Sequence, residues 1–141
     1  RARVLAIDAS EPALDVARDN ARRLALDIDF RAGDWLAGVG DRRFDLLLSN
    51  PPYIDGDDPH LAALHAEPKQ ALTPGADGLT DLRTIIEQAP AHLAGGGWLL
   101  LEHGHDQSDA VTLALCSAGF AEVTTRRDLA GLPRCSGGRR P

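Results

Sequence analysis

The sequence predicts an α/β fold in which helices cover a mostly parallel sheet, and three observations support this prediction. Short apolar segments alternate with amphipathic segments of helical periodicity along the 141 residues, as in chains built from alternating strands and helices. The first apolar segment, residues 4–7, contains no polar residue, which is typical of a parallel strand buried on both faces. Polar residues follow the expected strands at their carboxyl ends, where open α/β sheets bind ligands.

Length and composition fit a single soluble domain, residues 1–141. Hydrophobic residues make up 43% of the chain and charged residues 26%, which suits a domain with a core and not a disordered chain. The net charge of -6 lacks the positive field that attracts nucleic acid. Cys116 and Cys135 have neither metal-ligand nor redox spacing, and the sequence has no secretory signal and no membrane-spanning apolar run. We therefore expect a cytoplasmic protein, with membranes excluded and nucleic acid disfavoured as partners.

The N-terminal part is expected to form a strand and then a helix. The strand at residues 4–7 ends at Asp8. Ser10 can cap a helix that has Pro12 in its first turn and covers about residues 11–25. The apolar face of this helix recurs at helical spacing and consists of Leu14, Ala17, Ala21 and Leu24.

Two further strands follow, and the second runs into a proline-rich loop. Residues 28–31 alternate between apolar and polar, and residues 44–49 form an apolar segment. The two prolines directly after this segment forbid both a helix and ladder pairing. Residues 55–78 contain Pro, Gly and Asp with little periodicity, which predicts a long irregular crossing with one helical turn near residues 60–65.

The C-terminal part is expected to contain two helices and at least two strands. Residues 79–93 have helical periodicity, and the glycines at 95–97 are expected to end that helix. Residues 135–140 have poor strand propensity and are only a weak candidate for a final strand. The elements expected between these segments are a strand at residues 98–102, a helix at 108–118 and a strand at 120–126.

Three residues at strand ends predict a pocket for a nucleoside. Asp8 can accept hydrogen bonds from both hydroxyls of a ribose. After the next strand, Asp34 and Trp35 can bond and stack an adenine. Each residue also has an ordinary explanation, since Asp8 can cap a helix, Asp34 can end a turn and Trp35 can belong to the core. Their joint occurrence near the following motif favours the nucleoside pocket.

The most specific motif is the tetrapeptide Asn50-Pro51-Pro52-Tyr53, directly after an expected buried strand. A nitrogen conjugated to a carbonyl or ring is a weak nucleophile, so an enzyme must hold its hydrogens and aim its lone pair. The Asn50 side-chain oxygen and the Pro51 carbonyl can accept the two N–H groups, and the Tyr53 ring can cover the flat substrate. The alternative is an ordinary proline-rich turn. No metal is implied, because the five histidines lack ligand spacing.

Motifs along nearly the whole chain match one protein family. They are Asp8-x-Ser10 with Ala13-Leu14 and Ala17-x-x-Asn20, Gly33-Asp34-Trp35, residues 49–54, Glu67-Pro68-x-x-Ala71-Leu72, Gly75-x-Asp77-Gly78-Leu79, residues 96–104 and Gln107. In these segments the chain resembles the peptide chain release factor glutamine methyltransferases, which methylate the side-chain amide of the glutamine in a Gly-Gly-Gln motif. The block from residue 67 to residue 79 separates this family from its relatives.

The resemblance implies a class I, Rossmann-like methyltransferase sheet with S-adenosylmethionine as cofactor and a release factor as partner. It places Asp8 at the ribose, Trp35 at the adenine and Asn50 beside both cofactor and glutamine, while Asp34 is assigned to the cofactor from its position after the second strand. Pro51, Pro52 and Tyr53 would complete the amide site. Glu67 and Pro68, with residues 75–78, would wall the glutamine pocket, for which turn chemistry is the ordinary explanation. We expect a monomer.

One departure from the family concerns the start of the chain. The family has an earlier strand and a glycine-rich cofactor loop, and both should precede Arg1. We therefore expect residues 1–141 to be a partial catalytic domain that lacks this strand and loop. The strands at Val4 and Phe44 would then lack their shared neighbour. The resulting hypothesis is that these residues alone are marginally stable and bind the cofactor poorly.

Two other functions stay open. One is a methyltransferase acting on an exocyclic amine of rRNA or DNA, which would use the same kind of loop; the net charge of -6 argues against it. The other is an inactive truncated remnant that binds a protein partner or nothing. Methylation assays on a release factor, rRNA and DNA distinguish the first, and an upstream strand with a Gly-x-Gly-type loop would argue against the second.

Overall fold

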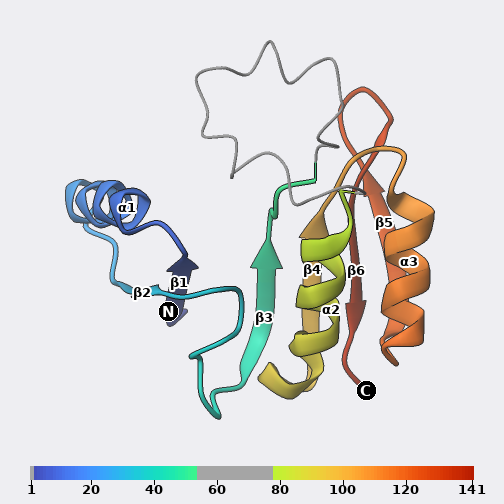
Figure 1. Ribbon diagram of the computed structural model, residues 1–141, viewed down its shortest axis with the longest axis horizontal. Coiled ribbons are helices and arrows are strands. Elements are labelled where there is room, and N and C mark those ends of the chain that lie inside the picture. The colour runs from blue at the N-terminus through green and yellow to red at the C-terminus, as the bar shows by residue number, and fades with distance from the viewer. Residues whose placement is uncertain (1, 54–77) are drawn as a thin grey trace. The chain divides into compact units, whose positions relative to one another are not determined.

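The computed structural model describes residues 2–53 and 78–141. The chain divides into two compact units, residues 1–41 and residues 42–141 (Figure 1). Each unit has its own sheet. The helical turn expected near residues 60–65 lies outside the described residues. Within the described stretches, no helix has the length and apolar character needed to cross a membrane.

The first unit pairs two parallel strands with one helix. β1 (Val4–Asp8) and β2 (Ile28–Ala32) are parallel, with Asp8 opposite Ala32. The connecting helix α1 (Glu11–Arg23) begins as predicted, because the Ser10 hydroxyl oxygen accepts a hydrogen bond from the Ala13 N–H at 3.3 Å. Helix α1 ends two residues before the predicted end, at Arg23. The buried apolar side chains of this unit are Leu14, Ala21 and Val39.

The second unit contains a mixed four-stranded sheet. Its strands are β3 (Phe44–Ser49), β4 (Leu93–Glu102), β5 (Ala121–Arg127) and β6 (Pro133–Arg139). They lie in the order β3-β4-β6-β5, so the last strand in the sequence is an internal strand of the sheet. β3 and β4 are parallel, whereas β6 is antiparallel to both of its neighbours. The predicted α/β architecture is confirmed, with the antiparallel pairing confined to the C-terminal strands.

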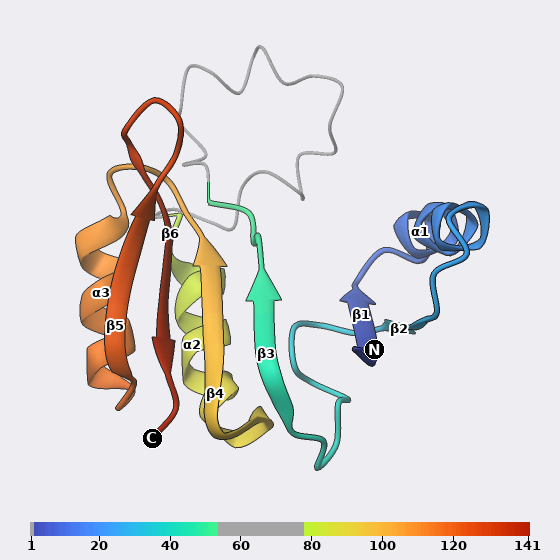
Figure 2. The same cartoon turned by 180° about the vertical axis from the view of Figure 1, so that it is seen from behind.

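Two helices cover one face of this sheet. α2 (Thr80–His92) and α3 (Ser108–Ser117) lie in front of the strands in Figure 1 and behind them in Figure 2. Leu99 and Leu101 of β4 are fully buried, and side chains alternate across a strand, so both point to the covered face. Leu46 and Leu48 of β3 lie opposite Trp98 and Leu100, whose side chains point to the other face of the sheet. They are 47% and 69% exposed. The core of the unit therefore lies between the sheet and its two helices.

The glycine run at residues 95–97 corrects one prediction. These glycines do not separate a helix from a later strand, because β4 begins at Leu93, whose backbone is already extended. A Cβ atom on Gly97 would lie 2.9 Å from the carbonyl oxygen of Phe44, and the register between β3 and β4 shifts at this point. Glycine is required where two strands approach so closely.

Strand β6 is formed by residues that have poor strand propensity. Its glycines are explained by close packing, because a Cβ atom on Gly137 would collide with the carbonyl oxygen of Leu99. A Cβ atom on Gly138 would lie 2.7 Å from the Cβ atom of Phe120. Tertiary packing therefore outweighs intrinsic propensity in this strand.

Replacing Gly137 with alanine is expected to lower the free energy of unfolding by about 1–3 kcal/mol, because the added methyl group overpacks against β4. Gly95→Ala is the matched control, since a Cβ atom there meets nothing within 4 Å. Denaturant unfolding of the two variants measures the difference. Equal stability of the two variants would contradict the close approach of β6 to β4.

A short chain of buried hydrogen bonds joins β4, β5 and β6 near one end. His103 and Ser136 are fully buried. His103 Nε2 lies 2.8 Å from the Ser136 hydroxyl, which lies 2.7 Å from the Thr125 hydroxyl, and His103 Nδ1 lies 2.8 Å from the Gly104 carbonyl. A carbonyl only accepts, so His103 Nδ1 carries a hydrogen and donates it to Gly104. These buried polar groups are therefore satisfied.

Candidate functional site

Asp8 and Asp34 lie where the sequence predicts them, Asp8 as the last residue of β1 and Asp34 two residues after the end of β2. The Gly33 N–H donates a hydrogen bond to the Asp8 carbonyl at 3.1 Å, which joins the two strand ends. Asp8 and Asp34 are both exposed. One Asp8 carboxylate oxygen accepts from the Ser10 N–H at 2.8 Å, while the other has no partner among the described residues. The role of Asp8 at the start of α1 therefore accounts for only one of its two carboxylate oxygens.

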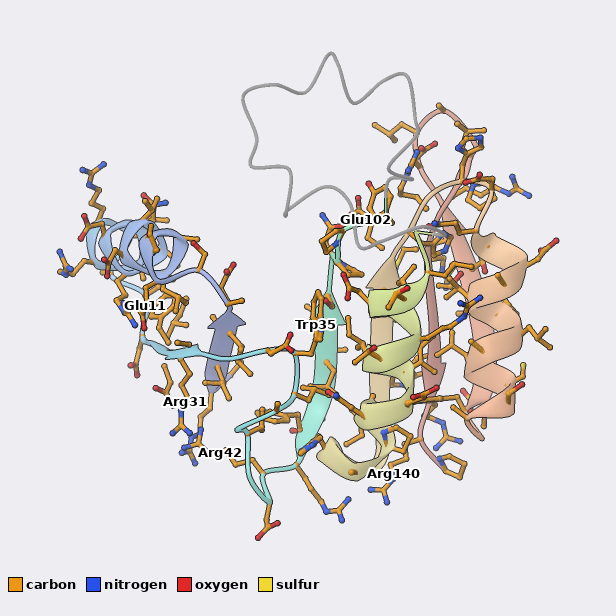
Figure 3. All side chains as sticks on the ribbon, in the orientation of Figure 1. Glu11, Arg31, Trp35, Arg42, Glu102 and Arg140 are labelled. Atoms are coloured by element: carbon orange, nitrogen blue, oxygen red, sulfur yellow. The ribbon has the colours of Figure 1, made fainter. Side chains whose placement is uncertain are left out.

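Trp35 has a left-handed backbone, with φ of 50°, which residues other than glycine rarely adopt. Such a conformation costs about 1–3 kcal/mol and persists only where the surrounding structure enforces it. The residue is half-buried and lies in a turn in which the Ala37 N–H donates to the Asp34 carbonyl at 3.0 Å. The preceding Gly33 is closely packed, since a Cβ atom there would lie 3.2 Å from the Ile7 side chain. The local fold therefore constrains the backbone of Trp35, a residue labelled in Figure 3.

The residues at this end of the first unit fit a nucleoside. The exposed carboxylates of Asp8 and Asp34 supply acceptors for hydroxyl and amino hydrogens, and the Trp35 indole supplies a flat apolar face. Among residues 2–53 and 78–141, no cluster of three or more His, Cys, Asp or Glu could hold a metal ion.

In the second unit, the tetrapeptide directly follows β3. Ser49, the last residue of β3, lies opposite Leu101 in the parallel register, so Asn50 and Glu102 occupy matching positions at the carboxyl ends of neighbouring strands. Asn50 is exposed, and its side chain has no hydrogen-bond partner among the described residues. Pro51 is fully buried and anchors the tetrapeptide. The Asn50 amide is therefore available to a ligand on a loop with a fixed base.

Tyr53 is held by the acid at the end of β4. Its hydroxyl donates a hydrogen bond to a carboxylate oxygen of Glu102 at 3.1 Å, a residue labelled in Figure 3. Burial raises the pKa of Tyr53, as do the hydrogen bond to Glu102 and the charge of that residue, whereas Arg134 opposes them. The Tyr53 phenol therefore stays protonated at neutral pH, and its ring is tied to β4.

Tyr53 is the only tyrosine of residues 1–141, so in a polypeptide of these residues ultraviolet titration of tyrosinate reports on Tyr53 alone. We expect a midpoint above the ordinary pKa of about 10. Glu102→Gln should lower the midpoint, although burial keeps it above the ordinary value. Because the folded pKa is raised, the associated stability is present below the unfolded pKa and is lost as pH rises through the folded pKa. A wild-type midpoint at or below the ordinary pKa would contradict the contact with Glu102.

Sequence reasoning missed two residues that contact the tetrapeptide. Glu102 is an acid at the carboxyl end of a strand, the same signal that selected Asp8, and could have been found in that way. The Gln107 side chain donates to the Tyr53 carbonyl at 3.1 Å, and its distance along the sequence hides this contact. Glu67 and Pro68, the predicted wall of the glutamine pocket, lie outside the described residues.

Comparison with known protein families shows which family the chain belongs to. Residues 1–123 match the family model described as "Methyltransferase small domain". The chain belongs to this family. The fold of this methyltransferase small domain is also similar to that of solved methyltransferases. A methyltransferase from Pyrococcus furiosus aligns with a TM-score of 0.74 and 21% identity, covering 98% of this chain and 62% of that protein. A ribosomal protein L11 methylase from Lactobacillus delbrueckii subsp. bulgaricus aligns with a TM-score of 0.69 and 21% identity, covering 99% and 59%.

Curated relatives of this methyltransferase small domain carry a more specific name. A protein from Pseudomonas aeruginosa, named "Release factor glutamine methyltransferase", is 48% identical over 134 residues, covering 93% of this chain and 49% of that protein. A protein of the same name from Burkholderia pseudomallei is 51% identical over 150 residues, covering 99% and 52%. The chain thus spans about half the length of the curated relatives it matches.

Proposed function

We propose that the chain is part of an enzyme that transfers a methyl group from S-adenosylmethionine to the side-chain amide nitrogen of a glutamine in a peptide chain release factor. The observation that carries the proposal is the tetrapeptide after β3, in which the exposed Asn50 amide has no hydrogen-bond partner among the described residues and is followed by a buried Pro51. The name shared by the relatives that are 48% and 51% identical supports the release factor as substrate.

In this proposal, the first unit binds the nucleoside part of the cofactor. The Asp8 carboxylate oxygen that has no partner among the described residues accepts hydrogen bonds from the ribose hydroxyls, Asp34 accepts from the adenine amino group, and Trp35 stacks on the base. When bound, S-adenosylmethionine supplies a methyl group on an activated sulfonium. The catalytic demand on the protein is therefore positioning of the acceptor and exclusion of water.

The tetrapeptide positions the acceptor amide in this proposal. The Asn50 side-chain oxygen and the Pro51 carbonyl oxygen accept the two N–H bonds of the glutamine, so that the nitrogen lone pair has one orientation. Pro51 and Pro52 have fixed φ angles and keep the two acceptors in place. The Tyr53 ring, fixed through its hydroxyl to Glu102, covers the flat face of the amide. Asn50 is also proposed as a cofactor-binding residue, and Glu67 and Pro68, which lie outside the described residues, as substrate-binding residues.

A methylation assay with the full-length protein that carries this chain tests the proposal. The acceptors are a purified release factor, the same factor with the glutamine of its Gly-Gly-Gln motif replaced by alanine, ribosomal RNA and duplex DNA. We expect labelled methyl groups to appear only on the unaltered release factor. Methylation of RNA or DNA, or equal labelling of the alanine variant, would refute the proposed substrate. We further propose that the enzyme acts as a monomer in the cytoplasm, where release factors work.

A further inference from the structure

One side chain outside the tetrapeptide connects both described ends of residues 54–77. Gln107 Nε2 donates hydrogen bonds to the carbonyl oxygens of Tyr53 and Gly78, each at 3.1 Å. Its Oε1 accepts from the Gly104 N–H at 2.9 Å. The orientation of the carboxamide is unambiguous, because its nitrogen faces two carbonyl oxygens and its oxygen faces an N–H. Both side-chain hydrogens of Gln107 are therefore used to hold backbone on either side of residues 54–77.

Gly78 packs closely against the Gln107 side chain and the Tyr53 carbonyl. Gly78 has a left-handed backbone with φ of 63°, and a Cβ atom there would lie 2.6 Å from Gln107 Nε2 and 2.7 Å from the Tyr53 carbonyl oxygen. The Gln107 backbone is fixed as well, since its N–H donates to the Gly104 carbonyl and its carbonyl accepts from the Val111 N–H, each at 3.0 Å. The Gln107 side chain, which donates to the Tyr53 carbonyl, is therefore attached to a hydrogen-bonded backbone at the start of α3.

Gln107 occupies the N-cap position of α3, but its side chain does not cap the helix. Side chains at this position commonly accept from the free N–H groups of the first turn. Gln107 instead contributes its hydrogen bonds to the segments that contain Tyr53 and Gly78, so stabilisation of α3 does not explain the contact.

We infer that Gln107 is a positioning residue for the acceptor amide: its carboxamide fixes the Tyr53 backbone against Gly78 and thereby sets the orientation of the tetrapeptide. Tyr53 is then held at two points, at its carbonyl by Gln107 and at its hydroxyl by Glu102. Only the two prolines separate Tyr53 from Asn50, and their restricted backbone transmits the position of one to the other. This inference rests on the proposed function for its substrate, whereas the contact itself does not.

Gln107→Glu tests the inference in the full-length protein with the release factor as acceptor. The substitution keeps the shape of the side chain but places a carboxylate oxygen against two carbonyl oxygens. A negative charge at the N-terminus of α3 favours the helix, so the helix should persist. We expect kcat/KM for the release factor to fall about 10²-fold, as for a small misplacement of a reacting group, with an unchanged KM for S-adenosylmethionine. Asp109→Asn, an amide-for-carboxylate exchange at an exposed residue of the same helix, is the matched control and should behave as wild type.

Hydrogen exchange measures the contact without any substrate. In Gln107→Glu, the amides of Tyr53, Gly78 and Leu79 should exchange faster, while those of β4 and α3 keep their protection. Gly78→Ala disrupts the same contact from its other side and should give the same fall in kcat/KM and the same faster exchange. This second variant keeps the inference testable if Gln107→Glu does not fold.

The outcomes separate this inference from the proposed function. Wild-type protein that does not methylate the release factor refutes the proposed substrate, while the exchange experiment still tests the contact. Unchanged exchange in both variants overturns the inference whatever the substrate is. Wild-type kcat/KM for the release factor in both variants also overturns it. A variant that has a lower Tm and is impaired equally toward the release factor and S-adenosylmethionine overturns it as well, because such a loss would be a general structural effect.

Discussion

Replacing Asn50 with alanine in the full-length protein is expected to reduce kcat by about 10²–10³-fold, the effect of removing one preorganised polar contact to a reacting group. The Asn50 side chain is exposed and has no hydrogen-bond partner among the described residues, so its removal leaves no internal contact unsatisfied. The dissociation constant of the cofactor should change little, because the lost acceptor acts mainly on the substrate amide. Steady-state kinetics and calorimetric titration measure the two quantities.

Asn20→Ala is the matched control for this experiment, since Asn20 is the other asparagine of the chain and is exposed on α1. It should retain wild-type turnover. Asn50→Asp keeps an oxygen at the same place and should lose less activity than the alanine variant if acceptance of the N–H bond is what matters. An alanine variant with wild-type kcat would remove Asn50 from the mechanism.

A polypeptide of residues 1–141 alone is expected to bind S-adenosylmethionine more weakly than the micromolar range. The predicted nucleoside residues belong to the first unit, whose buried apolar side chains are few, while Val16, Leu24 and Leu26 are 61%, 68% and 53% exposed. A unit of about 40 residues rarely folds stably without further support. The sheets are also separate, so that β1 and β3 each leave an edge without a partner in the described residues.

Calorimetric titration of this polypeptide beside the full-length protein measures the difference in affinity. Hydrogen exchange should also show faster exchange in β1 and β2 than in β4, which is paired on both sides. Micromolar binding by residues 1–141, or equal protection of the two units, would show that the first unit is stable as it stands and would refute the prediction.

Local rules predicted most of the fold. The start of α1 follows from Ser10 and Pro12, and the ends of β1 and β3 follow from apolar runs that stop at polar residues. These rules also placed Asp8 at the end of a strand and Asp34 and Asn50 just beyond one, where the structure has them. They succeed because capping and side-chain alternation depend on neighbours in the sequence.

Contacts between distant segments could not be predicted in this way. The glycines at 95–97 have the composition of a helix end, but the close approach of β3 places them inside β4. The glycines of β6 weaken a strand in isolation, whereas in the sheet they admit β4 and Phe120. Gln107 reaches Tyr53 only because α3 begins near the carboxyl ends of β3 and β4. Each depends on tertiary packing, which local propensity does not contain.

The internal position of β6 has a consequence for the order of events during synthesis. β5 is hydrogen-bonded to β6 and not to β4, so the sheet cannot close when β5 emerges from the ribosome. Closure requires residues 133–139 to leave the exit tunnel and enter between two strands made earlier. Until then the apolar edge of β4 stays open to other nascent chains, a period in which chaperone protection matters.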